Sequence, residues 1–372
     1  MGRVYIIDVT NRDGVQTSRI GLAKLEKTLI NMYLNEMGVY QSEFGFPFTN
    51  HETNYINANL ELVKMGVLVP IRLEGWCRAI KKDVELAFKL CPAIRHLNLS
   101  ISTSPLMLEL KFGGKMSIDS VIGSMVEAVQ TAYKLGAETV GVNAEDASRT
   151  EIEDLIKFAK TAKDAGAKRA RYCDTLGTDD PLNIYDRMKE LATKTKIDWE
   201  MHCHNDLGMG VACSVAGAKG IIDGGQDAYI NTTINAVGER AGNADLLSVL
   251  LALKYSSGLK DKNLFPPEMK LNKIWAFAKY ASYAFGIPIP VNQVGVGANA
   301  FAHESGIHAD GALKNRRNYE LYDYEELGRG EPELVETGRM ITVGEYSGIK
   351  GFRNVFGTLE VEFKDDAEAA RV

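Results

Sequence analysis

The sequence predicts a parallel (β/α)8 barrel, or TIM barrel, followed by a smaller and mostly helical C-terminal appendage. Short runs of β-forming residues alternate with longer segments of helical period, and this alternation requires parallel strands joined by crossover helices. Eight strand–helix units occupy residues 4–258, a length of 255 residues, which is close to the roughly 250 typical of this barrel. An open doubly wound sheet is the structural rival. It would carry a glycine-rich phosphate fingerprint after its first strand, where this chain has Asn11-Arg12-Asp13-Gly14.

The eight candidate strands are separated by segments with helical spacing of apolar residues. In residues 118–133 the apolar side chains fall on one stripe with a period of about 3.6 residues. A second such stripe lies within residues 22–33, and the eighth helix is expected at 242–257. The predicted strands are residues 4–10, 41–47, 71–77, 94–102, 139–146, 170–177, 199–206 and 228–235.

The character of the chain changes after residue 259. Pro266-Pro267 interrupts it, a helical segment follows at about 271–285, and Pro288 and Pro290 interrupt it again. We therefore expect two domains, a barrel of residues 1–259 and a helical C-terminal subdomain of residues 260–372.

Composition and charge narrow the classes of function. The chain of 372 residues carries 43 basic and 49 acidic side chains, a net charge of −6, which argues against a general electrostatic affinity for nucleic acid or anionic membranes. Its five cysteines form no C-x-x-C pair, so a disulfide framework is not expected. No signal segment and no long apolar run is visible. We expect a cytoplasmic protein whose partners are small molecules or other subunits.

The candidate site is the barrel mouth, where the carboxyl ends of the strands meet. His202 and His204 lie two residues apart on one strand, so both imidazoles face the same side. With Asp13 from the first strand they form a set of two histidines and one carboxylate, which suits Zn, Mn, Fe or Co better than Mg. The alternative is an ordinary hydrogen-bonded pair of histidines. Cys203 should point to the opposite face and pack there; a Cys–His nucleophile is the less favoured interpretation.

Two further motifs leave alternatives open. The turn at residues 238–243 contains Gly238, Glu239, Arg240 and Gly242, and it either lines the phosphate or pantetheine path of a cofactor or is an ordinary turn. The basic run at residues 314–317 is either solvated surface or a phosphate contact.

Six motifs in order, covering nearly the whole chain, carry a family resemblance. They are residues 8–16, 45–47, 145–150, 202–208, 235–243 and 303–311. With them the chain resembles the metal-dependent acyl-CoA:2-oxo acid condensing family, which includes isopropylmalate, citramalate and homocitrate synthases. Within this family it is most similar to the nitrogenase-type homocitrate synthases.

The resemblance implies a Claisen-type condensation of acetyl-CoA with a 2-oxo acid, followed by hydrolysis that releases CoA. A divalent metal (Zn, Mn, Co or Mg) polarises the ketone, and the subdomain of one subunit completes the site of another in a homodimer. The implied metal ligands are Asp13, His202, His204 and Asn243; the implied catalytic residues are Arg12 for the enolate and Glu145, His308 and Tyr319 for proton transfer. We expect substrate contacts from Gln16, Glu43, Arg78, Ser100, Asn143 and Thr233. If the turn at residues 238–243 lines the cofactor path, the expected CoA contacts are Gly238, Glu239, Arg240 and Gly242.

Departures from the family pattern bear on the substrate. Asn11 and Val15 replace the usual Leu and Glu of the first motif, and Gly141 stands where lysine-pathway homocitrate synthases carry an arginine. Homocitrate synthase, with 2-oxoglutarate, is our first expectation; a Re-type citrate synthase, with oxaloacetate, follows, and then isopropylmalate or citramalate synthase. A metal-dependent aldolase or lyase and a non-catalytic metal-binding protein are the rival classes. We expect no leucine-type regulatory domain.

Overall fold

The computed structural model describes residues 2–330, 340–344 and 346–371. The chain divides into two compact units, which are described separately below. The first contains the residues up to Lys270 together with Ala284–Gly286, and the second contains Leu271–Tyr283 and the residues from Ile287 onward. The domain boundary at residue 259 stays a prediction. Within the described ranges no helix combines the length and the apolar character that crossing a membrane requires.

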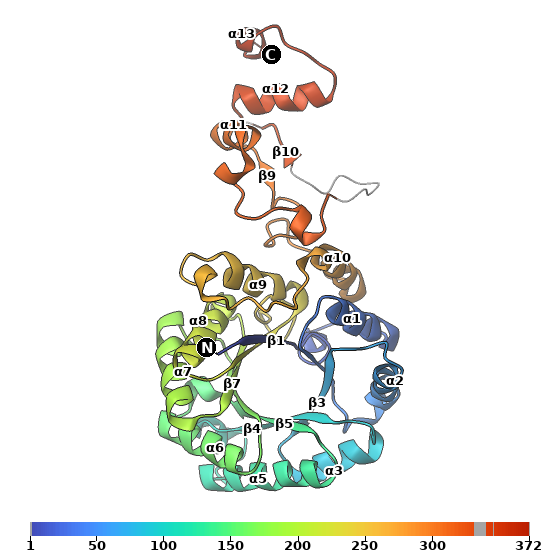
Figure 1. Ribbon diagram of the computed structural model, residues 1–372, viewed down its shortest axis with the longest axis vertical. Helices are drawn as coiled ribbons and strands as arrows, with labels where there is room; N and C mark the ends of the chain where they lie inside the picture. The colour runs from blue at the N-terminus through green and yellow to red at the C-terminus, as the bar shows by residue number, and fades with distance from the viewer. Residues whose placement is uncertain (1, 331–339, 345, 372) are drawn as a thin grey trace. The chain divides into compact units, whose positions relative to one another are not determined.

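The first unit is a closed barrel of eight parallel strands, so the predicted fold class is confirmed (Figure 1). Each strand pairs with the next along the chain, and β8 closes the ring by pairing with β1. Strands β1, β2, β6, β7 and β8 end two or three residues earlier than predicted because their last predicted residues already belong to the loops of the mouth. The strands are β1 Val4–Asp8, β2 Gln41–Gly45, β3 Arg72–Arg78, β4 His96–Ser102, β5 Thr139–Glu145, β6 Arg169–Asp174, β7 Asp198–Cys203 and β8 Ala228–Thr232.

Helices surround this barrel (Figure 1), as predicted from the helical spacing of apolar residues between the strands. Helix α5 buries Val121, Ile122 and Met125 on the predicted stripe, and the Ser117 hydroxyl caps its first turn. A short additional helix, α4, lies between β4 and α5. The helices of this unit are α1 Lys24–Glu36, α2 Thr53–Lys64, α3 Lys81–Leu90, α4 Pro105–Leu110, α5 Ile118–Lys134, α6 Ile152–Asp164, α7 Pro181–Thr195, α8 Gly210–Asp223 and α9 Leu246–Tyr255.

Aromatic rings fill the barrel where its strands begin. The ring of Tyr5 lies 4.8 Å from that of Tyr40 and 4.9 Å from that of Tyr229, measured between centroids. Large side chains from neighbouring strands fill the interior of such a barrel in layers, so this end is a packed core. Access to the interior is therefore from the opposite end, where the strands finish.

Farther along the strands the interior holds a buried network of ion pairs. Arg169 and Arg171 lie two residues apart on β6, and both point into the barrel. Arg169 lies 2.6 Å from Glu74 and 3.0 Å from Glu200. Arg171 lies 2.5 Å from Glu43 and 2.5 Å from Glu200. All five side chains are almost completely buried. Each charge therefore has a partner of opposite sign, as burial in a medium of low polarity requires.

The second unit is mostly helical, as predicted, with a small parallel sheet. Its helices are α10 Ile274–Phe285, which crosses the division between the units, α11 Gly306–Lys314, α12 Ile349–Thr358 and α13 Asp366–Ala369; strands β9 Ala302–His303 and β10 Met340–Ile341 form the sheet.

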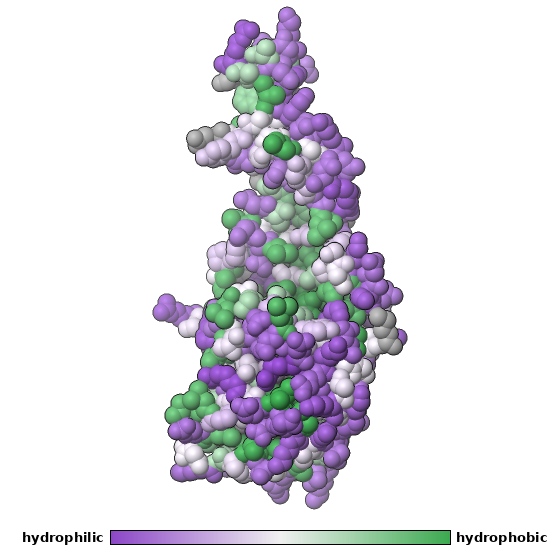
Figure 2. Space-filling model, turned by 90° about the vertical axis from the view of Figure 1, so that its left-hand side faces the viewer, coloured by the Kyte–Doolittle hydropathy of each residue, from purple (hydrophilic) through white to green (hydrophobic). Residues whose placement is uncertain are grey.

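On the face drawn in Figure 2, hydrophilic residues cover much of the surface and hydrophobic residues stand among them in patches. Such a mixture is ordinary for a protein surface in contact with water.

Candidate active site at the barrel mouth

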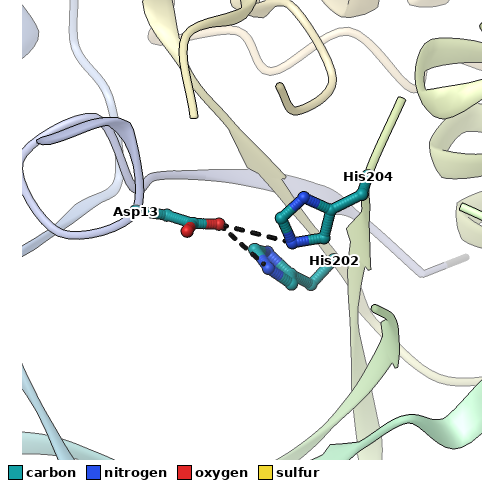
Figure 3. Close-up of side chains that lie close together, drawn as sticks. All are labelled: Asp13, His202 and His204. Carbon is teal, nitrogen blue, oxygen red and sulfur yellow. Dashed lines mark ion pairs between the residues drawn. The ribbon is translucent and has the colours of Figure 1, made fainter. Parts of the chain in front are cut away.

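Three potential metal ligands converge at the mouth of the barrel. Asp13 lies in the turn after β1, and its Oδ2 atom is 3.2 Å from Nε2 of His202 and 3.6 Å from Nε2 of His204 (Figure 3). The two imidazole rings stand nearly perpendicular, at 89°. All three side chains are buried, and one ligand atom from each lies within 4.8 Å of the others. The structure thus brings together the set that the two-residue spacing and the strand ends predicted.

Electrostatics keep Asp13 and His204 in the protonation states that bind metals. Burial alone would raise the pKa of Asp13, but the Arg12 guanidinium and the two histidines beside it hold that pKa well below its usual range. Burial lowers the pKa of His204 to about 4, and the neighbouring His202 adds to the effect. At neutral pH the carboxylate is therefore ionised and the His204 ring is neutral, as ligation requires.

Asn243 supplies a fourth donor beside the trio. It pairs with His204 in an isolated backbone bridge, and its side chain is buried. The Nδ2 atom donates to the carbonyl of Val237 at 3.2 Å, whereas the buried Oδ1 atom has no hydrogen-bond partner among the described residues. An orphaned buried oxygen next to two imidazoles and a carboxylate fits a divalent cation with nitrogen and oxygen ligands.

The glycines of the turn at residues 238–243 have a packing role. A Cβ atom on Gly238 would lie 2.1 Å from Nδ2 of Asn243. Gly242 has a φ of +88°, and a Cβ atom there would lie 1.9 Å from the carbonyl oxygen of Ala236. Gly238 therefore leaves room for the Asn243 side chain, and Gly242 allows the backbone of the turn to lie against the carbonyl of Ala236. Arg240 fixes the same turn through an ion pair with Asp206, 2.8 Å between Nε and Oδ1.

Arg12 is held by ion pairs beside the three candidate metal ligands. Its Nε atom donates to the carboxylate of Glu43, and one terminal nitrogen lies 3.4 Å from Asp13. Glu43 is in turn anchored by Arg171, so the buried network of the barrel interior supports the guanidinium from below. The arginine is 7% exposed, and its guanidinium lies 5.8 Å from the centre of the Trp76 ring. A fixed positive charge thus stands at the edge of the trio.

A cavity of about 680 Å³ opens above these residues, within the usual size range of small-molecule sites. One part of its wall is apolar, formed by Phe46, Trp76, Ile80, Ile101, Phe112 and Met116. Eleven predicted site residues also line it: Arg12, Asp13, Gln16, Arg78, Ser100, Asn143, Glu145, His202, His204, Glu239 and Arg240.

Five other predicted site residues are not among the lining residues: Glu43, Thr233, Gly238, Gly242 and Asn243. The hydroxyl of Thr233 donates to the carbonyl of Val237 at 2.7 Å, so this side chain supports the turn after β8. Glu43 acts through Arg12, to which it is bonded. The expected direct substrate contacts of Thr233 and Glu43 stay predictions.

Comparison with known proteins decides the family. Residues 3–280 match the family model described as HMGL-like, and residues 296–371 match that described as Homocitrate synthase post-HMGL domain-like. The chain belongs to the HMGL-like family. The resemblance to acyl-CoA:2-oxo acid condensing enzymes drawn from the motifs is thereby confirmed.

Several curated relatives of this HMGL-like chain match it over almost its whole length. It is 60% identical over 370 residues to "Citrate (Re)-synthase" of Dehalococcoides mccartyi, covering 100% of this chain and 89% of the relative. It is 40% identical to "2-isopropylmalate synthase 2" of Caldanaerobacter subterraneus, covering 95% and 85%, and 37% identical to "Homocitrate synthase AksA" of Methanocaldococcus jannaschii, covering 93% and 79%.

Solved structures share the fold. Hydroxymethylglutaryl-CoA lyase from Pseudomonas aeruginosa superposes with a TM-score of 0.62 at 14% identity, covering 77% of this chain and 94% of that one. The Bacillus subtilis HMG-CoA lyase gives 0.60 at 17%, covering 78% and 96%. At such identities the likeness establishes the barrel architecture alone.

Glu145, the last residue of β5, has partners that sequence reasoning missed. The Nζ atom of Lys111 lies 2.6 and 2.9 Å from the two carboxylate oxygens of Glu145, and the hydroxyl of Ser102 donates to the same group. Ser102 and Glu145 are direct neighbours in the β4–β5 pairing. Lys111 follows the short helix α4, and nothing in its sequence context marks it as facing the mouth; only the strand register could have paired Ser102 with Glu145.

The second unit holds the two remaining predicted residues. The rings of His308 and Tyr319 lie 4.3 Å apart between centroids, and both side chains are exposed. Their expected part in proton transfer stays a prediction. In the basic run at residues 314–317, Lys314, Arg316 and Arg317 each pair with a carboxylate of the same unit.

Proposed function

We propose that this protein joins acetyl-CoA to oxaloacetate and releases citrate and CoA. The observation that carries the proposal is the 60% identity with a citrate (Re)-synthase over the whole chain, against 40% and 37% for the isopropylmalate and homocitrate synthases. This identity favours oxaloacetate over 2-oxoglutarate as the acceptor, which is the reverse of the order that the sequence motifs suggested. The match of residues 296–371 to a homocitrate synthase domain model keeps 2-oxoglutarate as the second candidate.

The proposed reaction begins with the acceptor held at the buried trio. Asp13, His202 and His204, with the Oδ1 atom of Asn243, would hold a divalent ion that polarises the ketone of the 2-oxo acid. The apolar wall of the cavity, which includes Trp76, offers a surface that keeps water away from the reacting carbons.

The chain's own residues then handle the enolate. The methyl group of acetyl-CoA is a very weak acid, so the negative charge that develops on the thioester oxygen needs a fixed positive partner. Arg12, clamped by Glu43 and nearly buried, fits this requirement. We assign the removal of the methyl proton to Glu145, whose carboxylate lines the cavity. The methyl carbon bonds to the ketone carbon, and water then cleaves the thioester, releasing the CoA thiol and the new carboxylate.

We also propose that the protein acts as a homodimer in which His308 and Tyr319 of one subunit assist the barrel of its partner. The two rings lie 4.3 Å apart at an angle of 34° and are exposed in the second unit, and an imidazole and a phenol are both groups that can transfer protons. Mixing two inactive variants tests this arrangement. An Arg12→Ala chain and a His308→Ala chain should regain activity together if sites form between subunits, and should stay inactive if each chain works alone.

A panel of acceptors tests the reaction itself. The protein is incubated with acetyl-CoA, Mn²⁺ and one of oxaloacetate, 2-oxoglutarate, 2-oxoisovalerate or pyruvate, and free thiol and the acid product are measured. We expect thiol release and citrate with oxaloacetate. Homocitrate from 2-oxoglutarate at higher efficiency would establish the second candidate instead. Absence of thiol with every acceptor, together with cleavage of 3-hydroxy-3-methylglutaryl-CoA, would contradict condensation and point to a lyase.

A further inference from the structure

The cations that line the mouth cavity differ in how firmly they are held. Arg12 and Arg171 are buried and bound to carboxylates of the interior network. Arg78 makes two hydrogen bonds to the buried carboxylate of Asp83, at 2.6 and 3.0 Å. Arg240 binds Asp206 and the carbonyl of Thr175. Each of these four guanidinium groups is bound to at least one carboxylate that does not line the cavity. These carboxylates are Glu43, Glu200, Asp83 and Asp206.

Lys111 is held differently, because both its partners line the cavity themselves. Its ammonium group contacts the Glu145 carboxylate at 2.6 and 2.9 Å and the Ser102 hydroxyl at 3.0 Å. The lysine side chain is 49% exposed and that of Glu145 is 29% exposed. An ion pair with this much access to water contributes little to stability. Lysine also carries a flexible stem and three donors, so a ligand carboxylate can join or replace Glu145 at the ammonium group.

The position of Lys111 suits one end of an extended acceptor. Ser102 and Glu145, which hold it, end β4 and β5, and in the closed strand order these strands lie opposite β8 and β1. Asp13 follows β1, so the trio and the ammonium group line the same cavity from different sides. An acceptor whose ketone end is held at the trio extends across the mouth, toward the strands that carry Ser102 and Glu145.

We propose that Lys111, supported by Ser102, binds the acceptor's carboxylate that is remote from the ketone and so selects dicarboxylic over monocarboxylic 2-oxo acids. This inference rests on the proposed function for its substrate, but its chemistry requires only a second carboxylate on the ligand. Lys111 is thus a specificity-determining residue, and Glu145 holds its ammonium group in position until the ligand arrives.

A pair of ligands that differ by one carboxylate tests the inference without turnover. Binding of malate and of lactate to the Mn²⁺-loaded full chain is measured by calorimetry for the unaltered protein, Lys111→Met and Lys111→Arg. A charge-assisted hydrogen bond lost in a partly buried site corresponds to roughly a 10- to 100-fold loss of affinity. We expect the unaltered protein to prefer malate by about that factor, Lys111→Met to lose most of this preference, and Lys111→Arg to keep part of it.

Lys115→Met is the matched control, because Lys115 lies four residues farther along the same segment, is exposed, and is not one of the cavity-lining residues that the described chain provides. It should keep the preference for malate. An undiminished preference in Lys111→Met, or no preference in the unaltered protein, would overturn the inference.

Steady-state kinetics separate this inference from the proposed reaction. In Lys111→Met we expect the KM for oxaloacetate to rise roughly 10- to 100-fold while the KM for acetyl-CoA stays unchanged. A fall in kcat with an unchanged KM for oxaloacetate would mean that Lys111 serves only to orient Glu145, and the inference would be wrong. The unaltered protein could make no citrate and yet prefer malate over lactate, with that preference lost in Lys111→Met. In that case the proposed function fails and the carboxylate site stands.

Discussion

Asp8 should make the stability of this protein depend on pH between pH 4 and 8. It is the last residue of β1, and its side chain is completely buried. Its Oδ1 atom accepts a hydrogen bond from the backbone of Thr10 at 2.9 Å. Burial raises the pKa of Asp8 to about 7, although hydrogen bonds from Thr10 and Thr232 act in the opposite direction. The folded protein therefore binds this proton far more tightly than the unfolded chain does.

The sign and size of the effect follow from the two pKa values. Because the folded pKa lies above the unfolded value of 3.8, the contribution of Asp8 to stability is fully present below about pH 4 and is lost as the pH rises through 7. At about 1.36 kcal/mol per pKa unit, the total loss is about 4 kcal/mol, and about 3 kcal/mol of it falls between pH 5 and pH 8.

Asp8→Asn removes the titration and keeps the shape of the side chain. Urea unfolding of both proteins is measured at pH 5 and pH 8, so that the other titrating groups cancel in the difference. The stability of the variant relative to the unaltered protein should rise by about 3 kcal/mol over this interval. Asp119→Asn, at an exposed position on α5, is the control and should show no such rise. A constant difference between Asp8→Asn and the unaltered protein at the two pH values would refute the reasoning.

Three further substitutions probe the site and its support. Arg12→Lys loses the rigid fork that faces the enolate, so kcat should fall roughly 100- to 1000-fold; turnover equal to that of the unaltered enzyme would show that Arg12 is not the enolate partner. Arg171→Met removes one of the two basic partners of each of two buried carboxylates, Glu43 and Glu200, and should lower the free energy of unfolding by about 3 to 5 kcal/mol. Arg78→Met, at a side chain 58% exposed, should cost less than about 1 kcal/mol, so similar urea midpoints for the two variants would contradict the network. Gly242→Ala places a Cβ atom against the carbonyl oxygen of Ala236, so elemental analysis should find less bound metal, and full metal content would argue against the role assigned to this turn.

The sequence predicted the metal trio because its signal is local. His202 lies on β7 and His204 directly follows its last residue, Cys203, and the alternation of side chains along extended backbone places both on the same face. Asp13 follows β1, and in a barrel all strands finish at the same end, so no knowledge of pairing was needed to bring it near. Arg12 and Glu145, which the family resemblance implied, also line the cavity.

The interior ion network could not be predicted from the sequence in the same way. Arg169 and Arg171 alternate with apolar residues along β6, a pattern that also fits a strand with one solvated face. Only the strand register shows that Glu43 and Glu200 face these arginines inside the barrel. Such contacts join residues far apart in the chain.

The sequence did not predict Lys111 as a site residue for a related reason. It follows a six-residue helix, α4, that the alternation of strands and helices does not require. Its contact with Glu145 depends on the path of that inserted segment.

Titration of the metal-free protein with Mn²⁺ by calorimetry tests most directly whether one ion is held where β1 and β7 end. We predict one ion per chain, with an affinity that falls at least roughly 100-fold in His202→Ala, because replacing even outer partners of a metal site costs 10- to 100-fold. His51→Ala, at an exposed position, should bind as the unaltered protein does. Equal binding by His202→Ala and the unaltered protein would contradict the account.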